Sequence, residues 1–160
     1  MKKLSYIITI IITLIFCTAC TETVKIPEVK SAVENNAAVT VGHTDYQCRI
    51  SYVSDNVSSV SFLSPQNIKG LTFTKSENDR AVSLDSLICK SQNSAFSQNS
   101  VFGKITGVLS QIKPDNVKFI SKKNDLYMFS LKDNPVCKFF TDENGNIKSV
   151  SADGIKITFE

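Results

Sequence analysis

Apolar and polar residues alternate over most of the chain, and this two-residue period restricts the fold more than any other feature of the sequence. From Ala38 onward, short alternating runs follow one another and are separated by turn residues. Such runs are typical of β-strands with one buried and one wet face. The pattern predicts about ten strands in an antiparallel meander, five on each side of residues 100–112. The apolar positions that mark them are Val39 and Val41; Tyr46, Cys48, Ile50 and Tyr52; Val60 and Phe62; Leu71 and Phe73; Val82 and Leu84; Val117 and Phe119; Tyr127, Phe129 and Leu131; residues 136–140; Ile147 and Val150; and Ile155, Ile157 and Phe159.

One segment has the spacing of a helix instead. Ser100 is a suitable N-cap and Pro114 ends the segment, which predicts an amphipathic helix of about twelve residues. Gly103 and Gly107 fall on the face opposite Ile105, where they permit close approach or movement. Its apolar side carries Val101, Phe102, Ile105, Val108, Leu109 and Ile112.

A second, short helix is expected near the N-terminus. Pro27 would occupy its first turn, where proline is favoured. The residues that would follow it on one side are Glu28, Val29, Ala32 and Val33.

The first nineteen residues have the layout of an export signal, in which two lysines precede an uncharged apolar run and small residues. A membrane-spanning helix is the alternative. Residues 4–19 would span only about 24 Å, whereas a hydrocarbon core is about 30 Å thick. We therefore expect residues 1–19 to be a signal peptide.

The end of this segment, Thr18-Ala19-Cys20, resembles the lipobox of bacterial lipoproteins. In that family a small pair precedes a cysteine that is lipidated before the signal is removed, and Cys17 stands where the family usually has Leu. The resemblance implies that Cys20 carries acyl chains such as palmitate, and two or more such chains anchor a protein stably. The protein would then sit on the outer face of a bacterial membrane, which is the periplasmic side in a Gram-negative envelope. Ordinary cleavage that leaves Cys20 as a thiol is the alternative.

The charge balance excludes one class of partner. The chain has 18 Lys and Arg against 15 Asp and Glu, and Lys2 and Lys3 belong to the signal. A nearly neutral mature chain lacks the surplus of cations with which nucleic-acid binders displace counterions from phosphates. A hydrophobic content of 42% at low net charge also excludes a disordered chain.

Three cysteines follow Cys20, namely Cys48, Cys89 and Cys137. They are either structural thiols or contain one disulfide among the possible pairs. A metal site is not expected, because its ligands would have to cluster and His43 is the one histidine of the chain.

No set of residues predicts catalysis. His43 lies in an expected turn beside Asp45, and no nucleophile is identified to pair with it. Residues 142–146 superficially resemble a calcium loop but lack its ligand spacing and closing Glu, so a hairpin turn is expected there. The sequence thus predicts a protein without enzyme activity, cofactor or metal.

The order of the expected elements resembles the LolA-like superfamily of periplasmic lipoprotein carriers and mycobacterial lipid-carrying lipoproteins. The elements are a lipidated N-terminus, a short helix, five strands, a helix and five further strands, and they cover roughly residues 27–160. In that family a curved antiparallel sheet forms a half-barrel, and helices close its mouth over a hydrophobic pocket for acyl chains. The resemblance implies an α+β, strand-dominated half-barrel at residues 38–160, after a tether at residues 20–37.

A sheet with one apolar face must cover that face, and one helix is narrower than ten strands. Either side chains fill the space between helix and sheet, or part of it stays open as an apolar pocket. We expect a module that binds a lipid or another apolar ligand. The alternative is a structural or protein-interaction lipoprotein with a filled core, whose exposed sheet docks an envelope protein. The residues expected to line a pocket are Tyr46, Ile50, Tyr52, Phe62, Phe73, Ile105, Leu109, Phe129 and Phe159.

Overall fold

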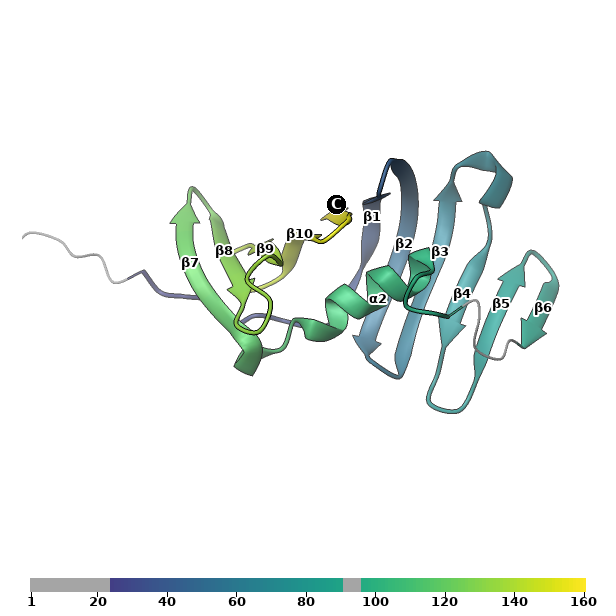
Figure 1. Ribbon diagram of the computed structural model, residues 1–160, viewed down its shortest axis with the longest axis horizontal. Coiled ribbons are helices and arrows are strands. Elements are labelled where there is room, and N and C mark those ends of the chain that lie inside the picture. The colour runs from purple at the N-terminus through teal and green to yellow at the C-terminus, as the bar shows by residue number, and fades with distance from the viewer. Residues whose placement is uncertain (1–23, 91–95) are drawn as a thin grey trace, which may run out of the picture.

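The computed structural model describes residues 24–90 and 96–160, which form one curved antiparallel sheet with a helix lying across it (Figure 1). The helix is α2 (Val101–Gln111), and single 3-10 turns occupy Gln66–Ile68 and Pro114–Asn116. The strands are β1 (Val33–Val41), β2 (Thr44–Ser54), β3 (Val57–Ser64), β4 (Thr72–Lys75), β5 (Arg80–Leu84), β6 (Leu87–Lys90), β7 (Val117–Lys123), β8 (Leu126–Leu131), β9 (Lys138–Thr141), β10 (Ile147–Ala152) and β11 (Ile155–Phe159). The strand-dominated α+β fold expected from the sequence is therefore confirmed. The expected signal peptide and Cys20 lie outside the described residues.

The two ends of the domain meet in the middle of the sheet. The strand order is β6-β5-β4-β3-β2-β1-β11-β10-β9-β8-β7, so neighbours in space are neighbours in sequence except at β1 and β11. Ala37 of β1 lies opposite Cys48 of β2 on one side and opposite Phe159 of β11 on the other. The outer edges of the sheet are consequently β6 and β7.

The register gathers apolar side chains on the concave face, and α2 covers the middle of that face. Because partners in adjacent strands share a face, one unbroken apolar row crosses the sheet from β2 to β7. Its members are Tyr46, Val39, Ile157, Val150, Phe139, Phe129 and Phe119.

The N-terminal segment differs from the expectation. Residues 24–32 have no regular secondary structure, so the short helix expected from Pro27 is not formed. The Lys30 amide donates a hydrogen bond to the Gly145 carbonyl oxygen (3.0 Å), and Val29 is buried. Contacts with the β9–β10 loop thus outweigh the local helix preference. Val33 already belongs to β1, so the sheet begins within the range expected to be a tether.

Six strands precede α2, one more than the sequence pattern predicts. The additional strand is β6, along which every residue is exposed, so that no buried face imposes a two-residue period. A two-residue turn, Asp85-Ser86, joins it to β5, and Asp85 takes a φ of 50° in place of the glycine that usually marks such turns.

The two predicted Gly-containing hairpins have different loops. Asp153-Gly154 forms the expected two-residue turn, with Ala152 opposite Ile155 and a φ of 67° at Gly154. Gly145 lies instead in the longer loop 142–146 between β9 and β10.

None of the helices in the described part of the chain has the length and hydropathy that a membrane span requires.

Candidate functional site

Helix α2 and the concave face of the sheet form the candidate site. The Ser100 hydroxyl accepts a hydrogen bond from the Gly103 amide (3.0 Å), which confirms Ser100 as the N-cap. The buried side of the helix carries Phe102, Ile105, Val108 and Leu109, and α2 packs against β2 and β11. The helix thus lies over the middle of the sheet, where the two halves of the chain join (Figure 1).

The structure brings the predicted pocket residues together in one hydrophobic core. Most of them are buried, whereas Tyr46 and Phe73 are only half-buried and pack against the edge of that core. Ile50, Ile105 and Leu109 have no exposed surface. Side chains therefore fill the space directly beneath α2. The buried members are Ile50, Tyr52, Phe62, Ile105, Leu109, Phe129 and Phe159.

Aromatic rings line the concave face beside the helix. Phe73 of β4 stacks on Phe102 of α2 (ring centroids 5.8 Å apart) and meets Phe62 of β3 edge-on (6.0 Å). Phe96, just before the helix, contacts both Phe73 and Phe102. Tyr46 extends this group through Phe62 (5.5 Å). We call these five residues the aromatic wall.

At one end of the concave face, the predicted residue Tyr52 meets the polar residues Asp55 and Lys75, which the sequence pattern does not predict. The Tyr52 hydroxyl donates a hydrogen bond to Asp55 Oδ1 (2.6 Å), and the Lys113 ammonium lies 3.7 Å from Asp55 Oδ2. Lys75 donates to the Asp55 carbonyl oxygen. Burial raises the pKa of the Tyr52 phenol, and the hydrogen bond to Asp55 and its charge raise it further. Lys75 follows Phe73 by two residues in β4, so the two side chains lie on the same face of the sheet. This two-residue spacing is the sequence feature from which the position of Lys75 could have been predicted.

Two small cavities lie between this polar end and the helix. One, of about 190 Å³, is lined by Tyr52, Asp55 and Lys75 of the sheet side and by Phe96 and Thr106 near or on the helix. A second, of about 300 Å³, shares Tyr52 and Asp55 with the first. Both are large enough for a small polar group but are not lined by most of the residues predicted for an apolar pocket.

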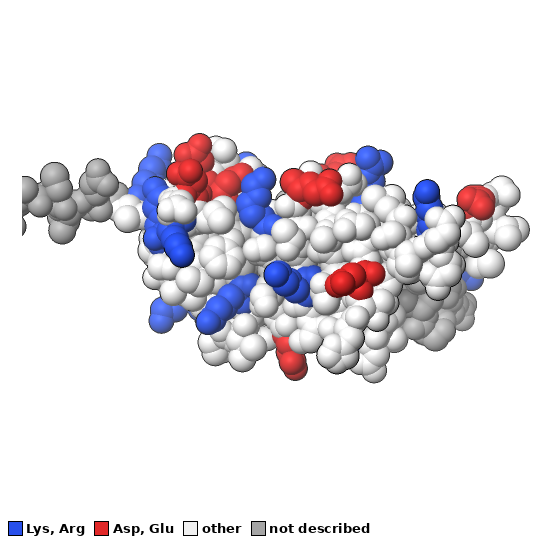
Figure 2. All heavy atoms as spheres, turned by 90° about the horizontal axis from the view of Figure 1, so that it is seen from above, with Lys and Arg blue, Asp and Glu red and all other residues white. Residues whose placement is uncertain are grey.

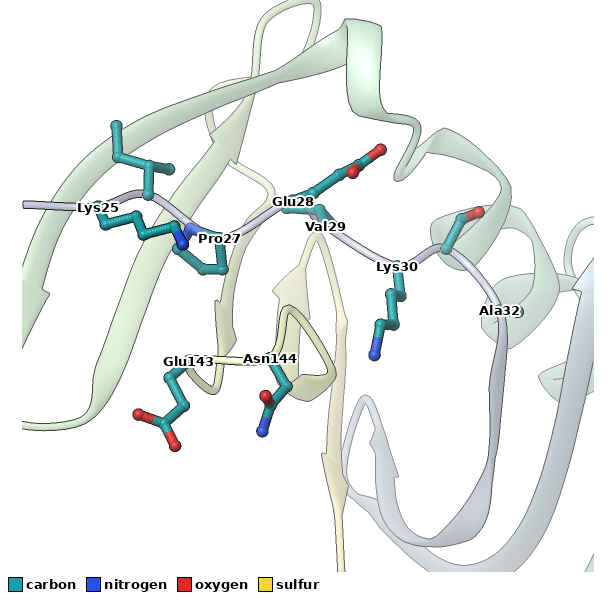
Figure 3. A pocket seen from close by; sticks show the side chains of 10 residues that line it. Lys25, Pro27, Glu28, Val29, Lys30, Ala32, Glu143 and Asn144 are labelled. Carbon is teal, nitrogen blue, oxygen red and sulfur yellow. The ribbon is translucent and has the colours of Figure 1, made fainter.

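A larger groove, of about 840 Å³, lies between residues 25–32 and the β9–β10 loop (Figure 3). Lys30, Glu143 and Asn144 point to one side of it and Glu28 to the other. Because lysines and glutamates are mixed in its lining, the groove favours no charge class of ligand.

In the loop at residues 142–146, the Asp142 carboxylate is hydrogen-bonded to other residues of the same loop. Asp142 Oδ1 accepts hydrogen bonds from the amides of Asn144 (3.0 Å) and Asn146 (2.9 Å), and Oδ2 accepts one from the Asn146 side chain (2.9 Å). Burial raises the pKa of Asp142, but these hydrogen bonds outweigh it and hold the pKa below its usual range. The carboxylate therefore stabilises a turn. Within residues 24–90 and 96–160, no three His, Cys, Asp or Glu side chains are grouped as metal ligands.

The cysteines in the described residues are free thiols. Cys48 and Cys137 are buried and Cys89 is exposed on β6. Burial raises the pKa of Cys48 to about 12 and also raises that of Cys137. The alternative of one disulfide is thus not what the structure has.

Charge is distributed unevenly between the ends of the sheet. Lys118, Lys122 and Lys123 lie on the edge strand β7, and Figure 2 shows basic side chains gathered at that end. The opposite edge, β6, presents Leu87 and Ile88, which are 71% and 70% exposed. An edge with lysines resists pairing with another strand, whereas an apolar edge favours it.

Comparison with known proteins gave a structural similarity only. No protein-family model matches the chain, and no curated protein sequence matches it. Among solved structures, the chain is similar to a crystal structure of a LolA superfamily protein from Nitrosomonas europaea. The two are 14% identical, with a TM-score of 0.36 over 82% of this chain and 68% of the other.

Proposed function

We propose that the protein is a non-catalytic binding module that takes the acyl chain of a lipid between α2 and the concave face of the sheet. The single observation that carries the proposal is the incomplete cover of an apolar concave face. A helix of eleven residues is about 16 Å long, while eleven strands spaced about 4.8 Å apart extend over about 48 Å. Apolar side chains on both flanks, including Phe73 and Phe119, remain half-buried.

The described conformation corresponds to the closed form of such a module. With the space beneath α2 filled by its own side chains, an acyl chain enters only when the helix moves away from β2 and β11. The buried face of α2 and the apolar rows of the sheet would then line the ligand. A closed core without ligand keeps these side chains out of water, which stabilises the empty protein.

Membrane attachment through an acylated Cys20 is the second part of the proposal and places the module on the outer face of a bacterial membrane. The test is Cys20→Ser in the full chain. We expect the variant to leave the membrane fraction or to change its gel mobility, because acyl chains supply the anchoring energy. Unchanged retention and mobility would contradict lipidation.

Lipid binding is tested on the Cys20→Ser protein, whose own acyl chains cannot interfere. We expect mass spectrometry of organic extracts to reveal a co-purifying lipid, and a fluorescent fatty acid to bind. Phe73→Glu should weaken binding of the probe because it places a charge on the concave face. Leu63→Glu is the matched control, since Leu63 lies on the convex face and is exposed. The carrier proposal would be wrong if no lipid co-purifies and the probe does not bind. It would also be wrong if Phe73→Glu and Leu63→Glu both fold and lower the affinity for the probe equally.

The exposed edge strand β6 favours a second candidate, a protein-interaction lipoprotein. A two-fold axis through Ile88 would pair β6 with its copy, placing Ile88 opposite itself and Leu87 opposite Cys89 of the second copy. The central positions of this contact carry Leu87, Ile88 and Cys89, and Lys90 falls opposite Ser86 at each end. A second copy is the occupant that we propose for the edge. Light scattering should then detect dimers that Ile88→Lys abolishes and Ile120→Lys, on the other edge strand, leaves intact. A monomer at all concentrations would remove this candidate.

A further inference from the structure

Polar side chains form one row across the end of the concave face where the β2–β3 and β4–β5 turns lie (lower end of these strands in Figure 1). Tyr52 is opposite Ser58, Ser58 is opposite Lys75, and Lys75 is opposite Arg80. Partners in adjacent antiparallel strands point to the same face. Tyr52 and Lys75 line the cavity of about 190 Å³ against α2, and Ser58 lies between these two residues in the row.

Ser58 in the middle of this row is an uncompensated polar group. It is 4% exposed, and within the described residues its Oγ has no hydrogen-bond partner. A buried hydroxyl without a partner destabilises the empty protein, and a ligand that offers an acceptor removes that penalty. The neighbours of Ser58 in the row, Tyr52 and Lys75, are themselves hydrogen-bond donors.

The charges around the cavity favour an anion. Lys113 lies beside the Asp55 carboxylate, which already accepts a hydrogen bond from the Tyr52 hydroxyl. Lys75 lines the smaller of the two cavities and Lys113 the larger. Lys75 is bound to a backbone carbonyl rather than to a carboxylate, so its positive charge is not neutralised by that contact. The two neighbouring cavities together thus present two ammonium groups, one carboxylate and hydroxyl groups. Ammonium and hydroxyl groups are the donors that bind carboxylate and phosphate oxygens.

The aromatic wall begins next to this row. Phe73 lies two residues before Lys75 on the same face of β4, and its ring contacts Phe62 and Phe102. Going along β4 from Lys75, the concave face therefore changes from basic to aromatic within about 7 Å. An anionic headgroup followed by a hydrocarbon chain matches this sequence of surfaces.

We infer that Ser58 and Lys75, beside Tyr52, form the headgroup subsite of the module, where the hydroxyl of Ser58 and the ammonium of Lys75 bind the anionic carboxylate or phosphate of an amphiphile whose acyl chain lies along the aromatic wall. The inference rests on the proposed function and adds the charge and the orientation of the ligand. Arg80, the next residue in the row, is exposed beside Lys75.

The test compares three single-chain ligands on the Cys20→Ser protein: palmitate, a lysophosphatidate, and hexadecanol as the neutral probe. Lys75→Gln should lower the affinity for the two anions about tenfold or more, because a charge-assisted hydrogen bond is lost. Its affinity for hexadecanol should stay unchanged. A preference of the unmodified protein for palmitate or for lysophosphatidate identifies the carboxylate or the phosphate as the bound group.

Two further variants separate the subsite from general effects. Ser58→Ala should weaken anion binding while the empty protein keeps or gains stability, since it deletes an unpaired buried hydroxyl. Lys69→Gln is the matched control, because Lys69 is exposed at the opposite end of β3 and β4. The headgroup subsite would be wrong if Lys75→Gln lowers the affinity for the anions and for hexadecanol equally, or lowers neither. If hexadecanol still binds in that case, the proposed function stands without it, whereas failure of all three ligands to bind the unmodified protein defeats both.

Discussion

Gly145 is the residue that lets the N-terminal segment lie against the β9–β10 loop. Its φ is 77°, and a Cβ at this position would come within 1.8 Å of the Glu28 carbonyl oxygen. Gly154 has a similar φ of 67° but open space around it. Both glycines thus require a positive φ, but only Gly145 is in close contact with another segment, at Glu28.

We predict that Gly154→Ala lowers the free energy of unfolding by about 1 kcal/mol, the cost of a left-handed conformation. Gly145→Ala should cost about 3 kcal/mol, because the backbone of the N-terminal segment must also move. Urea denaturation of both variants measures the difference. Equal effects would show that the contact between Gly145 and Glu28 contributes nothing to stability.

The thiols should differ in reactivity with an aromatic disulfide reagent. At pH 8, Cys89 is exposed and should react at once, whereas Cys48 and Cys137 should react only after unfolding, because burial raises the pKa of both and limits access. The reaction is followed spectrophotometrically on the protein with both Cys17→Ser and Cys20→Ser, with and without denaturant. Immediate reaction of a thiol that remains after Cys89→Ser would contradict the packing around Cys48 or Cys137.

At the scale of single elements, α2 contains two glycines with opposite surroundings. A Cβ on Gly103 would lie 2.0 Å from the Ser97 carbonyl oxygen, whereas one on Gly107 would meet nothing within 4 Å. We predict that Gly107→Ala stabilises the protein by about 0.5–1 kcal/mol through helix propensity, and that Gly103→Ala destabilises it. Thermal denaturation of the two variants is the measurement. A loss of stability in Gly107→Ala would contradict the open space beside Gly107.

Elements with a buried face were predictable from the sequence, and elements without one were not. The alternation at Tyr46, Cys48 and Ile50 and the helical spacing at Ile105 and Leu109 record which side of each element meets the core. Neither face of β6 is buried, so its sequence has no two-residue alternation of apolar and polar residues. The sequence around Val29 predicts a helix because the loop that this segment contacts, at Gly145, is distant in sequence.

The same reasoning explains what could be predicted of the candidate site. Its apolar residues, such as Phe62 and Phe73, follow from the alternation, and the structure places them in the core. The polar row does not follow, because Ser58 and Lys75 carry no apolar signal and are brought together only by the register of β3 and β4. Sequence periodicity thus identifies a face, whereas pairing between strands decides which polar groups meet on it.

At the scale of the whole molecule, the central position of β11 makes the sheet depend on the end of the chain. We predict that a chain ending at Gly154, which lacks β11, loses cooperative unfolding, because β1 and β10 then have no common neighbour. Circular dichroism during heating measures this. Changing Glu160, which lies beyond β11, to Ala is the control and should preserve a single sharp transition, whereas a sharp transition in the shortened chain would contradict the role of β11.

This arrangement also fixes the order in which the sheet can assemble during synthesis. The strand that joins the two halves is synthesised after the other ten strands, so a nascent chain that lacks it has at most two unconnected sets of hairpins. Their apolar faces cannot be sealed together until Phe159 has emerged. Assembly of the complete sheet is therefore post-translational for ten of its eleven strands, because these strands wait for β11.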